Sequence, residues 1–167
     1  MRSGRPKPLP PPSPTRESCG SCGTCCKLLE VPSLNKPTCQ WCVHAKPGRL
    51  PGACTIYEAR PIECRTFRCL WVMSHLDADK TPMPMSVRPD KSHVCFGALL
   101  MNGEAMEMGT AAHVDPAYPN AWLEWPMHQM MQQMVAQGVT IIIYCAGARK
   151  LWDRNGIRNI EPETKDG

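Results

Sequence analysis

Cysteines at close spacing are the residues of this chain most suited to chemistry. Nine of the eleven cysteines lie between Cys19 and Cys69. The opening run, CGSCGTCC, places Cys19, Cys22 and Cys25 at successive Cys-x2-Cys spacings and adds Cys26 directly after them. Two thiolates at this spacing, beside a glycine that permits a tight turn, can bind one metal ion. The overlapping pairs therefore predict a metal-binding segment.

Five more cysteines follow within the same segment and allow more than one kind of centre. They are Cys39, Cys42, Cys54, Cys64 and Cys69. Two closed tetrahedral zinc sites need eight thiolates, and nine are present. The opening run also resembles the first three ligands of a bacterial ferredoxin, so an iron–sulfur cluster is the second interpretation. Redox chemistry without a metal is the least favoured, because so many unmetallated thiolates would repel one another or oxidise.

Several other side chains in this segment bear on a metal centre. Trp41 could cover it from solvent, and His44 is an optional nitrogen ligand, although a surface histidine is the favoured interpretation because thiolates are already in excess. Arg60, Arg65 and Arg68 lie near the last cysteines and could stabilise a negatively charged thiolate cluster. For Arg65 and Arg68, solvated positions on a helix face are an equal alternative.

The spacing of Cys64 and Cys69 sets a condition on the local structure. Pro61 suits the first turn of a helix, which would carry Cys64 near its start. Cys69 would then lie about 140° further round an ideal helix. The two thiols can share a centre only if the helix ends or bends between them.

Charge and composition argue against several function classes. The formal net charge is +4, and residues 1–16 are basic without an acidic residue, so the remaining chain is close to neutral. This balance argues against a nucleic-acid-binding face, while a protein partner stays open. No apolar signal segment or membrane span is visible, and we expect a cytoplasmic protein in which clustered cysteines bind metal rather than form disulfides.

The order of elements predicts an α+β fold. We expect a disordered, proline-rich basic tail at 1–16, a cysteine-cluster metal-binding module of short helices and loops at 17–73, and a small α+β subdomain at 91–155. A polar tail at 156–167 ends the chain. In the subdomain we expect an antiparallel sheet with a hairpin at 94–110 that turns at Asn102-Gly103, and a strand at 139–146.

A helix at 126–137 is predicted to cover the sheet. Its apolar positions fall at helical spacing and end before Gly138; they are Met127, Met130, Met131, Met134 and Val135. Residues 147–150 are expected to turn. Cys95 and Cys145, each alone among apolar residues, are expected to be core residues.

The runs CGSCGTCC and CTIYEARPIECRTFRC resemble the YkgJ-type cysteine-cluster family, a CxxCxxCC group described as a putative zinc- or iron-chelating domain. The likeness covers about residues 19–71, and the Arg88-Pro89-Asp90 phrase and a later His113-Val114-Asp115-Pro116 are also similar to longer members. The resemblance implies eight metal ligands: Cys19, Cys22, Cys25, Cys26, Cys42, Cys54, Cys64 and Cys69. Cys39 is a ninth cysteine that the pattern does not require, and it is an alternate for Cys42.

Together these observations predict a protein that chelates zinc or iron through a thiolate cluster. The alternatives are an iron–sulfur redox protein or cluster-dependent enzyme component, and a zinc-ribbon-like interaction or nucleic-acid-binding module. No nucleophile elbow, phosphate loop, dinucleotide fingerprint or HExxH motif is present in the sequence. Any catalytic activity would therefore reside in the metal centre.

Overall fold

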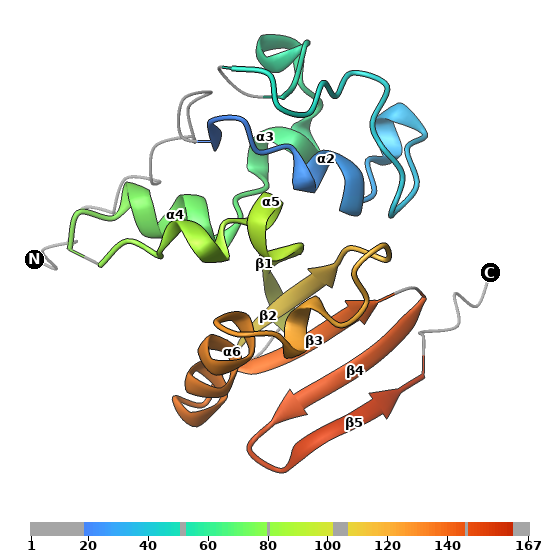
Figure 1. The fold of residues 1–167 in the computed structure, drawn as a ribbon. Helices are drawn as coiled ribbons and strands as arrows, with labels where there is room; N and C mark the ends of the chain where they lie inside the picture. Colours follow the sequence, from blue (N-terminus) through green and yellow to red (C-terminus); the bar gives the residue numbers. More distant parts are fainter. Residues whose placement is uncertain (1–18, 51–52, 80, 102–106, 146, 162–167) are drawn as a thin grey trace, which may run out of the picture.

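The computed structural model describes residues 19–50, 53–79, 81–101, 107–145 and 147–161. The cysteine-rich half, residues 19–79, consists of short helices and loops above a sheet formed by the second half (Figure 1). The predicted tail at 1–16 and the Asn102-Gly103 turn lie outside the described residues. Within the described part of the chain, no helix is long and apolar enough to cross a membrane.

The second half is a five-stranded mixed sheet, so the α+β prediction is confirmed and the predicted antiparallel sheet is wrong. The strands are β1 (Val94–Met101), β2 (Glu107–Val114), β3 (Thr140–Cys145), β4 (Ala148–Asp153) and β5 (Gly156–Ile160), in that spatial order. All neighbours are antiparallel except β2 and β3, which are parallel. A helical crossover between β2 and β3 returns the chain to the starting edge, and β3 therefore runs in the direction of β2.

Two segments of the second half differ from the sequence expectation. The strand expected to end at Thr110 continues to Val114, which pairs with Val94 at the start of β1. Residues 148–150, expected in a turn, begin β4, and residues 156–160, expected in a polar tail, form β5. In β4 the charged residues Arg149, Lys150 and Asp153 are half-buried, and in β5 Arg158 is exposed, so both strands resemble a solvated turn and tail in sequence. Residues 162–167 lie outside the described residues.

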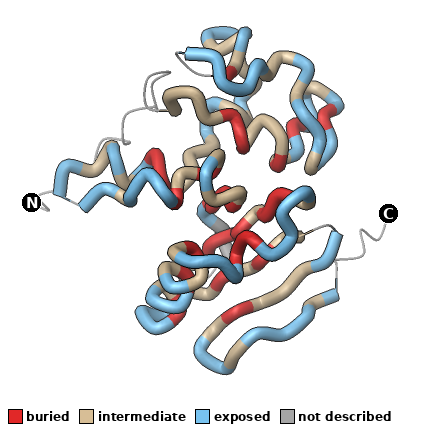
Figure 2. Tube along the Cα trace, in the orientation of Figure 1, coloured by how far each residue is buried: buried red, intermediate tan, exposed pale blue. Residues whose placement is uncertain are grey.

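The main core lies between the sheet and helix α6 (Met127–Ala136). Met127, Met131 and Val135 are buried on one face of α6, with Met130 and Met134 packed partly buried beside them. They meet a layer of buried sheet residues that includes Phe96, Ile141, Ile143 and Trp152. Figure 2 shows buried segments concentrated where α6 meets the sheet and where the cysteine-rich half approaches it. Burial of this apolar layer stabilises the sheet against α6.

The helices that carry the cysteines and link them to the sheet are all short. They are α2 (Thr24–Leu28), η1 (Pro32–Leu34), η2 (Tyr57–Ala59), α3 (Ile62–Thr66), α4 (Leu70–Leu76), η3 (Met85–Val87) and α5 (Pro89–Ser92), and η4 (Ala121–Leu123) precedes α6. Prolines follow η2 and η3 closely, at Pro61 and Pro89, and α5 ends before His93, which has φ 59°. Helices α2, α4 and α5 contact β1, which makes β1 the strand on which the cysteine-rich half is seated.

Two close contacts fix this seating. The Nζ atom of Lys27 in α2 lies 2.6 Å from a carboxylate oxygen of Asp115, directly after β2. In β1, a Cβ atom placed on Gly97 would lie 2.9 Å from Cε2 of Phe67, so the ring of Phe67 packs directly against the strand backbone. Phe67 lies between Cys64 and Cys69, and the sheet therefore positions the last two cysteines of the cluster.

Candidate metal-binding cavity

A cavity of about 120 Å³ in the cysteine-rich half is lined by all eight cysteines that the resemblance implies as ligands. They are Cys19, Cys22, Cys25, Cys26, Cys42, Cys54, Cys64 and Cys69. Cys39, Cys95 and Cys145 do not line it. Apolar side chains such as Val31, Ile56 and Val72 complete much of the wall. The fold thus gathers thiols from distant points of the segment around one apolar space.

The opening motif is a turn followed by a helix. Gly20 has φ 54°, in the left-handed region, and the amide of Cys22 donates a hydrogen bond to the carbonyl of Cys19 at 3.0 Å. Cys25 and Cys26 then fall in α2. In an extended strand, neighbouring side chains would point to opposite sides. In a helix, successive side chains are instead about 100° apart, and both Cys25 and Cys26 line the cavity.

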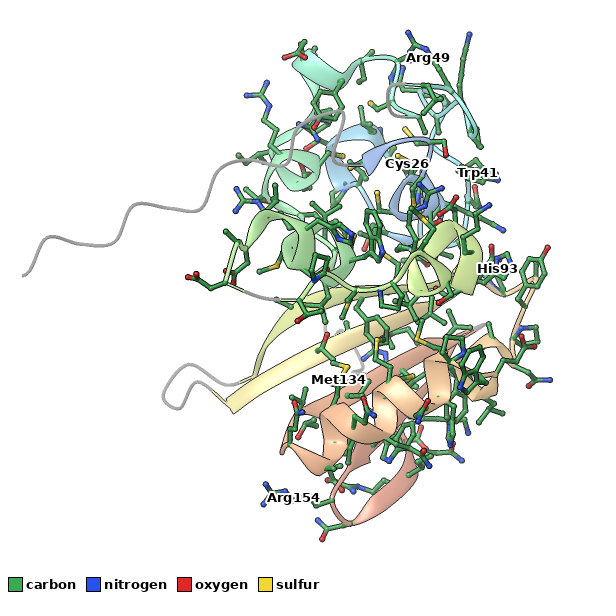
Figure 3. All side chains as sticks on the ribbon, turned by 60° about the vertical axis from the view of Figure 1, so that its left-hand side comes forward. Cys26, Trp41, Arg49, His93, Met134 and Arg154 are labelled. Carbon is green, nitrogen blue, oxygen red and sulfur yellow. The ribbon has the colours of Figure 1, made fainter. Side chains whose placement is uncertain are left out.

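The middle pair contributes one cysteine to the cavity. The amide of Cys42 donates a hydrogen bond to the carbonyl of Cys26 at 2.9 Å, which holds this loop against α2. Cys39 has φ 59° and does not line the cavity. Trp41 is 46% exposed and lies at the edge of this half, whereas Cys26 lies in its interior (Figure 3). Half-buried His44, expected at the surface, lines the cavity.

Cys64 and Cys69 meet the condition set by their spacing. Helix α3 ends at Thr66, where the amide of Phe67 closes it with a hydrogen bond to the carbonyl of Glu63 at 3.1 Å. The chain turns there, and Cys69 becomes the N-cap of α4. Both cysteines line the cavity as a result.

Three cationic side chains surround these thiols. Lys36 is only 6% exposed and donates hydrogen bonds to the carbonyls of Lys27, at 2.8 Å, and of Leu29. The guanidinium of Arg60 stacks over the Tyr57 ring at 3.5 Å and donates to the carbonyl of Tyr57 at 2.8 Å. Arg60 and Arg68 both line the cavity. Their positive charges favour ionised thiols there.

Arg68 brings a polar group that the described residues leave unsatisfied. Its Nε atom is buried and has no hydrogen-bond acceptor among them. Arg65, in contrast, lies exposed and donates to the carbonyl of Arg60 at 2.7 Å. Because a buried donor without an acceptor is costly, Arg68 is suited to donate to an acceptor that enters the cavity.

The cavity thiols differ in pKa because their surroundings differ. Burial, followed by the proximity of Cys69, raises the pKa of Cys19 to about 11. The hydrogen bond from Cys25 lowers the pKa of Cys26 below its usual value, and Lys36 and Arg60 act in the same direction. A hydrogen bond from Cys95 likewise lowers the pKa of Cys69. Cys26 and Cys69 therefore have the greatest thiolate character in this group.

The thiols are near one another without forming a closed coordination shell. No disulfide bond joins any of the eleven cysteines, all of which lie within the described residues. Among the described residues, no three or more His, Cys, Asp or Glu side chains are placed as they would be around a metal ion. The donor types suit zinc or iron, and their arrangement is that of an open cavity.

Two features near this site were not expected from the sequence. Cys95, buried as expected of a core residue, lowers the pKa of Cys69, and the buried ammonium of Lys36 contributes to the lowered pKa of Cys26. Strand alternation could have placed Cys95 on the sheet face opposite Val94 and Phe96, but it does not show that the cysteine-rich half covers this face.

Comparison of the chain with models of protein families, with curated proteins and with solved structures found no match. The resemblance to the YkgJ-type family therefore stays a prediction, carried by the cysteine motifs.

Proposed function

We propose that this protein chelates zinc or iron through the cysteines that line its cavity. The proposal rests on one observation, namely which cysteines the fold places around the cavity. Eight cysteines spread over the segment from Cys19 to Cys69 line one space, while Cys39, within the same segment, is left out. If these cysteines served only as small apolar residues, packing would not require their thiols to line the same cavity.

The residue types that line the cavity suit the binding of a metal by cysteine thiolates. Cysteine thiolates select zinc, copper(I) and iron–sulfur clusters, whereas calcium and magnesium prefer oxygen ligands. Lys36, Arg60 and Arg68 would offset the negative charge that several thiolates bring to one place. Binding requires the thiols to lose protons and to rotate inward, because the described side chains form no closed shell.

An iron–sulfur centre is the second candidate, and the unsatisfied Nε of Arg68 favours it. Hydrogen bonds to the sulfur atoms of a cluster adjust its reduction potential. Arg68 lines the cavity with a buried donor of this kind. When bound, such a centre would supply electron transfer, and the cavity side chains would set its charge and its access to water. A closed zinc site would instead be structural.

Competitive zinc titration tests the proposal. The reduced, metal-stripped chain is titrated anaerobically in the presence of a chromophoric chelator, alongside Cys64→Ser and Cys145→Ser variants. We expect the wild-type chain and the Cys145→Ser control to take zinc from the chelator equally, and Cys64→Ser to take less. A wild-type chain that takes none, in zinc and in parallel iron–sulfide reconstitution, would refute the proposal.

A further inference from the structure

Residues 29–36, here called the flap, turn back on themselves beside the cavity. Val31 and Lys36 pair as an isolated β-bridge at the base of the flap, and helix η1 lies between them. Asn35 has φ 48°, the left-handed conformation in which the chain reverses after η1. The flap contributes four residues to the cavity wall, namely Leu29, Glu30, Val31 and Leu34. It therefore forms one side of the space around the thiols.

The base of the flap is fixed and its tip is exposed. Val31 and Lys36 are buried. The ammonium of Lys36 donates hydrogen bonds to two carbonyls at the end of α2, those of Lys27 and Leu29. At the tip Ser33 is exposed, and among the described helices and strands none packs extensively against η1. Because segments with few packed neighbours open at a low free-energy cost, the tip is the part of this wall best suited to move.

One side chain joins the tip of the flap to the opposite wall. Ser33 donates two hydrogen bonds to the same carboxylate oxygen, Oε1 of Glu63, from its hydroxyl at 2.5 Å and from its backbone amide at 3.2 Å. Glu63 belongs to α3 and lines the cavity, as does the next residue, Cys64. The Oε2 atom of Glu63 is buried and accepts no hydrogen bond from the described residues. Ser33 thus ties the flap to the helix that carries Cys64.

We propose that Ser33 and Glu63 form a latch that controls access to the cavity. While the two hydrogen bonds hold, the tip of the flap stays against α3; when they break, the tip swings away and the cavity thiols become accessible. Hydrogen bonds to a charged group are stronger than neutral ones, so removal of one shifts the equilibrium toward the open state. The inference rests on the proposed function for the identity of the entering group, a metal ion, whereas the latch itself depends only on Ser33 and Glu63.

Thiol alkylation measures the opening of the flap without any metal. The reduced, metal-stripped full chain is treated anaerobically with iodoacetamide, and peptide mass spectrometry gives the reaction rate of each cysteine. Ser33→Ala and Glu63→Ala remove the latch, and Ser33→Thr keeps its hydroxyl. The matched control is Thr66→Ala, because the Thr66 hydroxyl donates to two carbonyls of its own helix, α3, at 2.9 and 3.3 Å. Circular dichroism verifies that each variant is folded.

We expect Cys64 and the other cavity thiols to react about two- to tenfold faster in Ser33→Ala and Glu63→Ala, the change in opening that loss of one hydrogen bond produces. Ser33→Thr and Thr66→Ala should match the wild-type rate at Cys64. Cys145, which does not line the cavity, should keep its wild-type rate in every variant. Equal acceleration at Cys145 would reveal general destabilisation and overturn the latch, as would unchanged rates at Cys64.

Zinc release separates this inference from the proposed function. Zinc-loaded chains are mixed with excess chelator, and Ser33→Ala should release zinc about two- to tenfold faster than wild type and Thr66→Ala. Equal release rates from all three chains would overturn the latch as a control on metal exchange and leave the proposed function standing. Alkylation that depends on Ser33 in a chain that takes up no metal would overturn the proposed function and leave the latch standing.

Discussion

The ammonium of Lys27 lies 2.6 Å from the carboxylate of Asp115, and this ion pair joins α2 of the cysteine-rich half to the residue that follows β2. Both side chains are largely buried, and the Asp115 carboxylate also accepts a hydrogen bond from the amide of Ala117 at 3.0 Å. The pair thus links the segment that carries Cys25 and Cys26 to the sheet, and its loss should be felt in the stability of the whole chain.

Removing one partner should be costly, because the other charge stays buried. We expect Lys27→Met to lower the free energy of unfolding by about 3 kcal/mol. Urea denaturation measures this. The matched control is Arg158→Met, which breaks an ion pair with Asp153 in which Arg158 is half exposed, and it should cost much less because water screens the pair. Equal losses in the two variants would show that the Lys27 pair does not link the halves.

The packing of Phe67 against Gly97 predicts an interaction between two substitutions. Gly97→Ala would place a Cβ atom 2.9 Å from the Phe67 ring, and we expect a loss of about 1–3 kcal/mol of stability. In a Phe67→Leu background the same glycine substitution should cost markedly less, because the flexible leucine can move aside. A double-mutant cycle measures the coupling, and strict additivity would contradict the packing described.

Cys42 and Cys39 should differ in their effect on metal content, because only Cys42 lines the cavity. We expect Cys42→Ser to reduce the metal bound after anaerobic reconstitution and Cys39→Ser to leave it at the wild-type amount. The two substitutions are chemically identical and three residues apart, so each is the control for the other. The reverse pattern would mean that the loop rearranges to present Cys39 when metal enters.

His113 predicts an acid-sensitive contribution to stability. Burial lowers its pKa to about 4 in the folded protein, where its ring stacks with Tyr144 at 5.0 Å. An unfolded histidine titrates near pH 6.5, so between about pH 6.5 and pH 4 the unfolded chain binds more protons than the folded chain. The stabilisation is complete above about pH 6.5 and is lost as the pH falls toward 4, by up to about 3 kcal/mol.

Urea denaturation of the metal-free chain across this pH range measures the effect of His113. A His113→Gln variant should lose the corresponding part of the pH dependence while other titrating groups still contribute theirs. Parallel pH profiles for wild type and His113→Gln would contradict a buried, neutral histidine at this position.

The sequence predicts which cysteines line the cavity, because their close spacing is visible in the sequence. The eight cavity-lining cysteines follow from the motifs and the family resemblance, and the end of α3 between Cys64 and Cys69 satisfies a condition that helical geometry alone imposes. Helix α6 also follows from its apolar stripe and the glycine after it. Local rules are sufficient for these elements because the relevant residues are close in sequence.

The remaining features depend on contacts between distant segments. Periodicity identifies a strand but not its direction, so it could not show that β3 runs parallel to β2. Residues 156–160 are mainly polar or exposed, and β4 rather than their own pattern makes them a strand. The environment of Cys95 depends on the cysteine-rich half covering one face of β1, which no local pattern encodes.

Elemental analysis of the anaerobically purified chain tests the central claim most directly, with zinc, iron and acid-labile sulfide measured beside a visible spectrum. The account predicts either about two zinc ions per chain without visible absorption, or iron with matching sulfide and a broad brown absorption. A folded, fully reduced chain that holds neither metal, and takes up neither on reconstitution, would contradict it.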